Sequence, residues 1–521
     1  MRCVQAYVIF AVESRSQRQL ELLQFPEISW LPVKLPVTML SKTLITGLFL
    51  TCIVVHAQTR SQKPGYEAKV QPAASAAYSQ QFMQDLTALR EAALASDYAY
   101  QQVAHLTENI GPRAIGSPQA QAAVNYVADE LRKLGLDVKL EEVRVPRWIR
   151  GAETAELVEY PGQAPGTTQK IVVTALGGNA PTTLEGITAE IVVVNSFEEL
   201  KALGRARVEG KIVLFTPGFD QRKAADGFAL EGYEEAVQYR GRGAKDAAAL
   251  GAVASLVRSV GTADFRLPHT GWSAPAGIPA GAVSSEDADL IAHLAAQGRV
   301  KIHLVLTAHN GPEVTSYNVV ADLKGSEHPE QVVVVSGHLD SWDLGTGAID
   351  DAAGVAVAMA TAQLVQQLHL RPARTIRVIA WMDEEYGGRG REAYAKVHAS
   401  EFANHTAAIE SDSGAAHPLG FMSRVATGAL PQLLPVQEVL RALGANLIKP
   451  VSEGPGADIE LLANAGVPSF GVLQDGRTYF HYHHTAADTL DKIAPQELRE
   501  NTAAMAVMGY ALANMPSPLL R

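Results

Sequence analysis

The sequence predicts an α/β protein whose central sheet, mostly parallel or mixed, is flanked by helices. Short apolar runs such as 331–335 (QVVVV) and 375–381 (TIRVIAW) are typical of strands that are buried on both faces. Segments of helical length with helix-spaced apolar or small residues, such as 120–134 and 352–368, stand between such runs. Because strands alternate with helices along the chain, most strands of the sheet are expected to be parallel.

The composition excludes several classes of protein. Of the 521 residues, 47% are hydrophobic and 19% are charged, which is the profile of a globular protein and not of a disordered or coiled-coil one. The formal net charge is −11, and without a basic excess or basic stripe no nucleic-acid partner is expected. Two cysteines cannot form a disulfide-rich scaffold or a four-cysteine zinc site.

The N-terminal part of the chain is expected to be a targeting signal. The apolar run 44–55 is shorter than the roughly 20 residues of a membrane-spanning helix and suits the core of a signal peptide. Ala57 follows as a small residue at a suitable cleavage position. We therefore interpret 1–57 as the signal-peptide region, with Met39 as the suspected true start. A secreted or periplasmic protein without a stable membrane span after cleavage is expected, and a short membrane anchor is the alternative.

Both cysteines, Cys3 and Cys52, lie in the part that cleavage would remove. The mature chain would then contain no thiol, which suits an oxidising compartment. Any metal site in the mature chain must therefore use His, Asp and Glu side chains. Residues 58–78 are polar and small and are typical of a linker or pro-segment.

The expected elements then follow in order. The spacing of apolar residues predicts a helix that begins at Ser79 and a second helix at 120–134, which Gly135 ends. Alternating polar and apolar residues predict a strand at 137–145. A break rich in Gly, Pro and Thr follows at 161–169, and we place a domain boundary there.

The segment 168–310 is interpreted as an inserted α/β module. The expected elements are strands at 191–194, 211–215 and 300–307 and helices at 247–257 and 285–297. The chain on either side, 79–167 and 311–521, is expected to form the main domain. Further helices are expected there at 433–443 and 495–514.

Imidazole and carboxylate groups follow the buried strands of the main domain. In open α/β sheets, sites form at the carboxyl ends of the strands. Five segments place such groups there: 336–340 (SGHLD), 349–352 (IDDA), 382–385 (MDEE), 410–413 (ESDS) and 481–489 (HYHHTAADT). Acidic groups in one cleft repel each other unless cations compensate, and mixed His and carboxylate ligands suit zinc. The ligands outnumber what one tetrahedral ion needs, so two bridged ions are expected.

These motifs resemble those of the co-catalytic zinc peptidases of family M28. SGHLDSWD, AIDDAAG, MDEEYGGRG, ESDSG and HHTAADT are similar to five successive family motifs. The DSWD and HLRPAR runs resemble the branch of plasma glutamate carboxypeptidase, also called carboxypeptidase Q. The resemblance spans about 80–515. It implies a zinc exopeptidase fold whose insert is similar to a protease-associated domain, a module that makes contacts and does no chemistry.

The resemblance implies a role for each residue that matches a motif. Two Zn²⁺ per chain are implied, with His338 and Asp412 on the first, Glu385 and His484 on the second, and Asp350 bridging both. The peptide bond between Asp350 and Asp351 tends to be cis in this family. Asp340 would orient the His338 ring through its carboxylate, and Asp488 would be the corresponding partner of His484.

Glu384 is implied as the general base. It would take a proton from the attacking water and pass it to the leaving amine. A further metal ligand is the alternative role for Glu384. Asp383 departs from the family pattern, which often has a small residue there, and its charge is expected to raise the pKa of Glu384.

Three residues are candidates for substrate contacts. Tyr482 and His483 are in a position to donate to the oxyanion or bind substrate, with packing or loop structure as the competing interpretation. Asp458 is a candidate for holding a free amine, and a helix N-cap explains it equally well.

The implied function is a secreted metallo-exopeptidase that hydrolyses dipeptides or short peptides. An aminopeptidase of the same family is the alternative. A glutaminyl cyclase with one zinc and a non-catalytic, receptor-like module are remote alternatives. The relatives suggest a homodimer.

Overall fold

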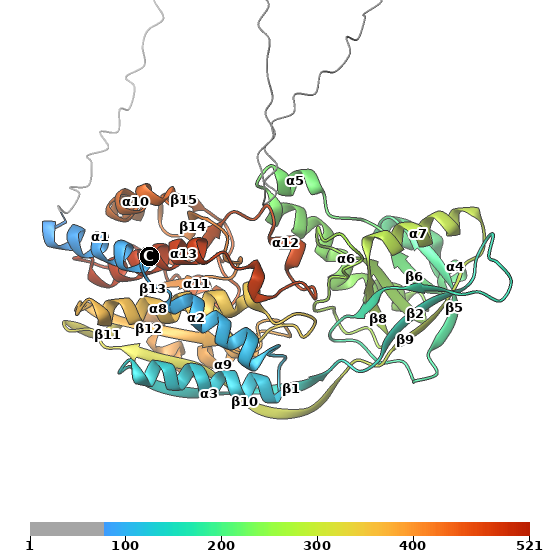
Figure 1. Ribbon diagram of the computed structural model, residues 1–521, viewed down its shortest axis with the longest axis horizontal. Coiled ribbons are helices and arrows are strands. Elements are labelled where there is room, and N and C mark those ends of the chain that lie inside the picture. Colours follow the sequence, from blue (N-terminus) through green and yellow to red (C-terminus); the bar gives the residue numbers. More distant parts are fainter. Residues whose placement is uncertain (1–77) are drawn as a thin grey trace, which may run out of the picture. The chain divides into compact units, whose positions relative to one another are not determined.

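The computed structural model describes residues 78–521, which are coloured in Figure 1. The expected signal-peptide region at 1–57, both cysteines, and the expected linker apart from Tyr78 lie outside the described residues. The described chain contains two sheets of eight strands each.

The first sheet has the order β1-β10-β12-β11-β13-β16-β14-β15. Its strands are β1 (Asp137–Ile149), β10 (His309–Leu323), β11 (His328–His338), β12 (Arg374–Trp381), β13 (His405–Glu410), β14 (Pro418–Arg424), β15 (Leu447–Pro450) and β16 (Ser469–Gln474). The neighbours β12, β11, β13 and β16 are parallel, whereas the pairs β1–β10, β10–β12 and β14–β16 are antiparallel. The prediction of a mixed central sheet in an α/β fold is confirmed.

Helices cover both faces of this sheet. The helices are α1 (Gln80–Leu94), α2 (Tyr98–Ala104), α3 (Pro118–Lys133), α8 (Ala353–Gln367), α9 (Arg389–His398), α10 (Leu434–Leu440), α11 (Glu460–Asn464) and α13 (Pro495–Asn514). Val333 and Val335 of β11 pack in the cluster that includes α8 and α13, and Val332 and Val334 pack in the cluster that includes Leu462 of α11. Since alternate side chains point to opposite faces, the run of valines is buried on both sides.

Helix α8 owes its apolar composition to this burial. The stretch Ala348–Gln367 is long and apolar enough to cross a membrane, but 94% of its most apolar window is buried inside the protein. Its small residues, among them Ala353 and Gly354, allow close packing at the end of β11. The helix begins at the edge of the sheet where the candidate site lies.

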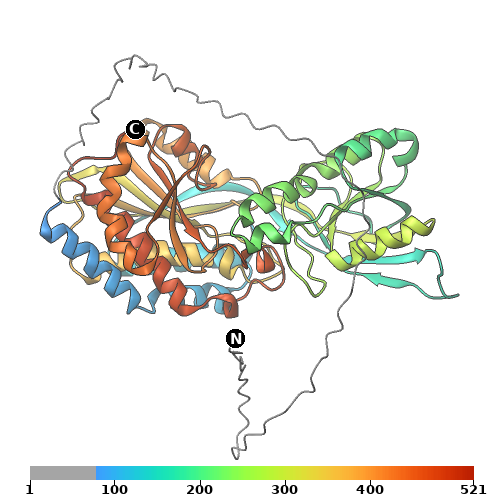
Figure 2. The ribbon, with the colours of Figure 1, turned by 90° about the horizontal axis from the view of Figure 1, so that it is seen from above.

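The second sheet has the order β3-β2-β9-β5-β6-β7-β8-β4. Its strands are β2 (Glu153–Glu159), β3 (Gln169–Ile171), β4 (Val173–Ala175), β5 (Ile187–Val194), β6 (Ile212–Phe215), β7 (Ala254–Arg258), β8 (Ala280–Val283) and β9 (Lys301–Leu306). Its helices, green to yellow-green in Figure 2, are α4 (Phe197–Val208), α5 (Gln221–Ala225), α6 (Ala229–Ala249) and α7 (Ser285–Gln297). We call residues 153–306 the second-sheet region.

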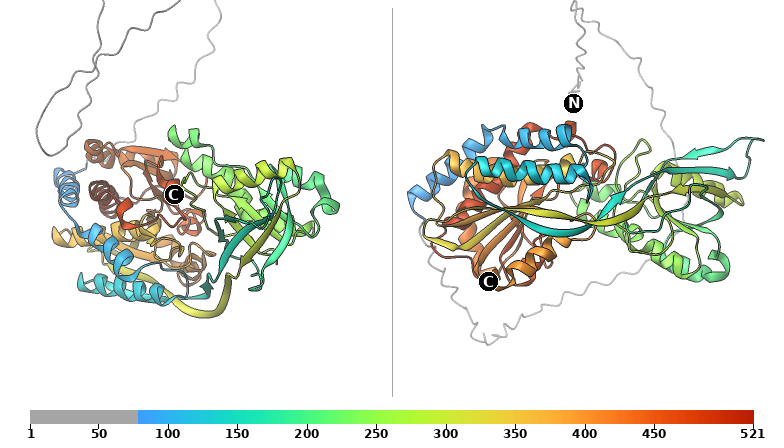
Figure 3. Two further views of the ribbon diagram at one scale, coloured as in Figure 1. Left: turned by 45° about the vertical axis from the view of Figure 1, so that its right-hand side comes forward. Right: turned by 90° about the horizontal axis from the view of Figure 1, so that it is seen from below.

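The chain passes between the two sheets along β1 and β10. These strands pair antiparallel from Asp137↔Asp322 to Ile149↔His309, with one irregularity near Pro146 (Figure 3). The predicted boundary at 168 is therefore wrong, because β2 already belongs to the second sheet. The break, up to residue 168, lies in the loop that joins the antiparallel strands β2 and β3.

The predicted helix at 247–257 is also wrong. Its first residues end helix α6, and its last residues begin strand β7. Gly251 separates them with a φ of +86°, a conformation that glycine adopts readily and that ends a helix. The small apolar residues of this segment fit a buried helix and a buried strand equally well.

Candidate active site

The motif residues gather where three parallel strands of the first sheet end. His338 is the last residue of β11, Glu384 and Glu385 follow β12, and Asp412 follows β13. Asp350 lies in the short segment η2 (Ala348–Ala352) that leads into α8. The fifth motif follows helix α12 (Tyr479–Tyr482). The strand ends bring side chains that are far apart in the sequence within contact distance.

Asp350 lies between two groups of donor atoms. Its Oδ1 is 3.0 Å from Nε2 of His338, which is 3.3 Å from Oδ1 of Asp412. Its Oδ2 is 3.2 Å from Nε2 of His484, which is 2.9 Å from Oε2 of Glu385. One carboxylate thus presents an oxygen to each group. The expected cis peptide bond between Asp350 and Asp351 is present.

Backbone carbonyls fix the tautomers of both histidines. Nδ1 of His338 donates to the carbonyl oxygen of Asp340 at 3.0 Å, and Nδ1 of His484 donates to that of Thr270 at 3.2 Å. In the neutral ring each Nε2 is then an acceptor that faces carboxylate oxygens. Acceptors at such distances repel unless a proton or a cation lies between them. The arrangement therefore suits a metal ion.

Burial acts on the acidic members of the cluster. It raises the pKa of Glu385 to about 7, with a further contribution from the charge of Asp350. Burial also raises the pKa of Asp412. In addition, Oε1 of Glu385 is buried and has no hydrogen-bond partner among residues 78–521. A bound cation would favour the charged carboxylates and satisfy this oxygen, and a set of imidazole nitrogens and carboxylate oxygens fits zinc.

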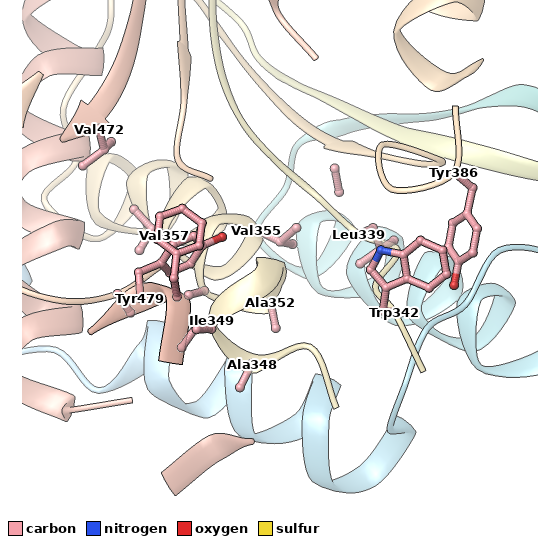
Figure 4. Close-up of a cluster of buried hydrophobic side chains, with 14 of the residues drawn as sticks. Leu339, Trp342, Ala348, Ile349, Ala352, Val355, Val357, Tyr386, Val472 and Tyr479 are labelled. Atoms are coloured by element: carbon pink, nitrogen blue, oxygen red, sulfur yellow. The ribbon is translucent and has the colours of Figure 1, made fainter. Parts of the chain in front are cut away.

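Buried apolar side chains support the segments that carry the donors (Figure 4). Leu339 and Trp342 lie after β11, and Ile349 lies beside Asp350. The rings of Trp342 and Tyr386 lie 4.1 Å apart between centroids. This packing holds the loops after β11 and β12 against each other.

The expected role of Asp340 is wrong in one respect. The ring of His338 is held by the backbone carbonyl of Asp340, not by its carboxylate. The carboxylate instead accepts from the backbone amides of Asp383 at 2.7 Å, Glu384 at 3.1 Å and Glu385 at 3.3 Å. Asp340 therefore positions the turn that carries the candidate base.

The expected role of Asp488 is also corrected. Its Oδ1 accepts from the backbone amides of Ala348 and Ile349, both at 2.8 Å. Asp488 therefore holds the segment that leads to Asp350, and His484 is oriented by Thr270 instead. The sequence motif correctly indicated a supporting carboxylate but not which backbone it supports.

Glu384 faces the pocket described below, and its backbone is held by Asp340. Burial raises its pKa well above the ordinary value, and the charges of Asp412 and Glu385 add to this effect. These causes account for the shift without the expected contribution of Asp383. The carboxylate of Asp383 pairs with the backbone amide and guanidinium of Arg389 at 3.0 and 2.8 Å.

A pocket of about 550 Å³ opens onto the donors. Asp350, Glu384 and His483 line it, and Nε2 of His483 is 3.4 Å from Oδ2 of Asp350. Tyr482 and Asp458 are not among the lining residues. The Lys492 ammonium lies over the ring of Tyr482, 5.4 Å from its centroid.

Asp458 does not cap a helix. Helix α11 has Ile459 at its N-cap position and no side-chain cap. Both carboxylate oxygens of Asp458 are buried without a hydrogen-bond partner in the described chain. Burial and the charge of Glu410 raise the pKa of Asp458 well above its ordinary value. The N-cap interpretation is therefore wrong.

The second-sheet region supplies residues that the sequence did not single out. Leu230, Tyr233, Arg240 and Trp272 line the same pocket. Nε2 of His269 is 2.9 Å from Nδ1 of His483. No motif marks these residues in the sequence, and only the contact between the two regions reveals them.

The comparisons with known proteins agree with this geometry. The model of peptidase family M28 matches residues 318–508. Human carboxypeptidase Q is 36% identical over 433 residues, which cover 82% of this chain and 88% of that protein. The crystal structure of a peptidase M28 precursor from Shewanella amazonensis is 38% identical, with a TM-score of 0.79 over 85% of this chain and 98% of that one.

A zinc aminopeptidase from Bacillus subtilis shares the fold, with a TM-score of 0.60 at 21% identity over 81% of this chain and 96% of that one. The resemblance stated from the five motifs is thus confirmed across most of the described chain. The chain belongs to peptidase family M28.

Proposed function

We propose that the protein is a zinc-dependent exopeptidase with two Zn²⁺ per chain. His338 and Asp412 hold one ion, His484 and Glu385 hold the other, and Asp350 bridges them. The observation that carries the proposal is the position of Asp350, with one oxygen toward each imidazole at 3.0 and 3.2 Å. Two donor groups around one carboxylate match the requirement of a two-metal site.

When bound, zinc supplies Lewis acidity and lowers the pKa of a water molecule at the site. Glu384 accepts a proton from the attacking water and returns it to the leaving amine. The raised pKa of Glu384 favours the first step, because it makes the carboxylate a stronger base. Asp340 keeps Glu384 in place through its backbone amide.

Dipeptides or short peptides are the proposed substrates, cleaved as by a dipeptidase or carboxypeptidase. Human carboxypeptidase Q, whose name indicates a carboxypeptidase, is a relative over most of the chain. Aminopeptidase activity is the alternative, since a structural neighbour is a zinc aminopeptidase. A one-zinc glutaminyl cyclase or a receptor-like module is disfavoured because every position of both donor groups is filled.

The proposal includes an extracytoplasmic location after removal of 1–57. It also includes a protease-associated character for the second-sheet region and a homodimeric state. N-terminal sequencing of the secreted protein tests the removal of 1–57, and light scattering tests the homodimeric state.

Zinc content and peptide hydrolysis of the purified protein test the main proposal together. The panel contains dipeptides with free termini, with a blocked N-terminus and with a blocked C-terminus. Two zinc ions per chain and a fall in kcat of about 100-fold or more in Glu384→Gln are expected. Glu392→Gln, an exposed change in α9, is the matched control. One zinc ion per chain, or an unchanged rate in Glu384→Gln, contradicts the proposal.

A further inference from the structure

We propose that Arg240 of helix α6 binds the C-terminal carboxylate of the substrate and so determines specificity for free C-termini. The inference rests on the proposed peptidase function and adds a residue-level reason for its substrate preference. Arg240 belongs to the second-sheet region and lines the pocket onto which the candidate metal ligands open. No sequence motif includes it.

The guanidinium of Arg240 is buried and has no acidic partner in the described part of the chain. Arg240 as a whole is only 8% exposed. Nη1 donates to the carbonyl oxygen of Thr270 at 3.1 Å and lies 3.3 Å from Nδ1 of His269, which can accept. It also lies 3.3 Å from Nδ1 of His484, which donates to the same carbonyl and so does not accept from Arg240. None of these hydrogen-bond partners is an anion. Nε is buried and has no hydrogen-bond partner among residues 78–521. Buried charges are normally paired, so this one lacks a partner that a ligand would supply.

Two other buried arginines among residues 78–521 are satisfied. Arg113 donates from Nε to Leu339, and from Nη1 and Nη2 to Thr346 and Gly347, at 2.7 to 2.8 Å. Arg377 forms a two-pronged ion pair with Asp322 at 2.7 and 2.8 Å. Arg240 differs from both because it faces a pocket and keeps donors unused. A planar carboxylate is the group that matches a guanidinium in two-pronged geometry.

The position of Arg240 sets where the peptide would be cut. Its Nη1 contacts the Nδ1 side of the His484 ring, whose Nε2 faces Glu385 and Asp350. The guanidinium is thus about one imidazole ring away from the donors. One residue of extended chain spans about 3.3–3.6 Å. A carboxylate held by Arg240 therefore belongs to the residue directly after the scissile bond.

Gly271 makes room for this arrangement. A Cβ atom at position 271 would lie 2.3 Å from Nη1 and 2.4 Å from Cζ of Arg240. Any side chain there must push the guanidinium away while leaving its charge in the protein. Gly271→Ala therefore displaces the proposed anchor without removing it, and serves as a second variant beside Arg240→Met.

The test compares the dipeptide alanyl-phenylalanine with its C-terminal amide. Wild-type protein is expected to prefer the free acid. Arg240→Met is expected to lower kcat/KM for the acid by about 100-fold, mainly through KM, and to leave the amide almost unchanged. Arg240→Lys keeps the charge but loses the two-pronged geometry, and an intermediate value is expected. Gly271→Ala should shift the preference in the same direction as Arg240→Met.

Arg242→Met on the same helix is the matched control, because Arg242 is exposed and pairs with Asp246. Zinc content and thermal unfolding of each variant show that the fold and the metal site remain intact. An equal loss for acid and amide in Arg240→Met would mean a structural role and overturn the proposal. Unchanged preference in this variant would overturn it as well.

Binding separates this proposal from the proposed function. Calorimetry on Glu384→Gln, with and without Arg240→Met, measures affinity for the acid and the amide without turnover. Selective binding of the acid that depends on Arg240, with no hydrolysis by the wild type, supports the anchor and refutes the peptidase function. Hydrolysis by the wild type without Arg240-dependent selectivity supports the peptidase function and refutes the role of Arg240.

Discussion

Nδ1 of His484 lies 3.2 Å from the carbonyl oxygen of Thr270, and the amide of Thr270 donates to the carbonyl of His484 at 2.9 Å. These reciprocal bonds join the second-sheet region to a candidate metal ligand whose φ is +57°. A hydrogen bond to the distal ring nitrogen fixes tautomer and orientation in metal sites. The second-sheet region, which contributes none of the five proposed zinc ligands, therefore shapes the site.

The three histidines of the segment 481–489 are expected to differ in their effect on zinc content. His484→Ala should remove about one ion of two, because only this ring contacts both Glu385 and Asp350. His483→Ala and His481→Ala should retain both ions. Metal analysis of the dialysed proteins measures this difference. A full zinc content in His484→Ala would show that another residue, and not His484, is the zinc ligand.

Asp488 is expected to tolerate asparagine but not alanine. Oδ1 accepts both backbone hydrogen bonds, and an asparagine amide oxygen accepts them equally. Asp488→Ala leaves two buried donors unpaired, which costs about 1–3 kcal/mol for each. Urea denaturation measures the loss of stability. Equal loss in both variants would show that the charge matters and not the acceptor.

Acid should destabilise the protein partly through His405. Burial lowers the pKa of His405 to about 4, below its ordinary value of 6.5. The unfolded chain then binds a proton at a higher pH than the folded one. Stability is therefore complete above about pH 6.5 and falls as the pH drops toward 4, by up to about 3 kcal/mol.

The neighbours of His405 explain why the neutral ring is required. Nδ1 donates to the carbonyl of Glu401 at 3.0 Å, so Nε2 accepts from the hydroxyl of Tyr394 at 2.7 Å. His405→Gln should flatten the dependence of unfolding free energy on pH between 4.5 and 7, relative to wild type. The exposed His293→Gln is the control. An identical slope in His405→Gln would exclude this histidine as the cause.

Removal of the metal should lower thermal stability. Without a cation, the buried carboxylates around Asp350 and Glu385 must be protonated or repel each other. A ligand that binds only the folded state stabilises it in proportion to the logarithm of its concentration. Treatment with chelator should lower the Tm, and added zinc should restore it. A Tm that does not respond would show that the cluster is structural.

The sequence predicted three of the eight strands of the first sheet, β1, β11 and β12, because their signals are local. The predicted helices at 285–297 and 495–514 coincide with α7 and α13, since caps and apolar spacing act within a few residues. The predicted boundary near 168 was wrong because a Gly/Pro-rich loop between two strands of one sheet has the same composition as a loop between two domains. Residues 247–257 failed because small apolar residues suit both a helix and a strand.

For the site too, the sequence predicted the residues that have a local signal and missed those that do not. His338 ends a buried strand, Glu385 follows another and Asp350 precedes a helix. The rule that sites form at the carboxyl ends of the strands in open α/β sheets therefore brings them together. The partners of Asp340 and Asp488 are backbone amides, which carry no sequence signature. Arg240 and Thr270 reach the site through contacts between distant parts of the chain, and no local pattern encodes such contacts.

The absence of cysteine among residues 78–521 affects how the metal site responds to oxidants. Peroxide converts a metal-binding thiolate into sulfenic and then sulfinic acid, so that a site built on sulfur is lost under oxidative attack. Imidazole and carboxylate donors, the only kinds in the cluster around Asp350, are not part of that chemistry. The arrangement resists oxidants and yields to acid, which protonates all of its donors.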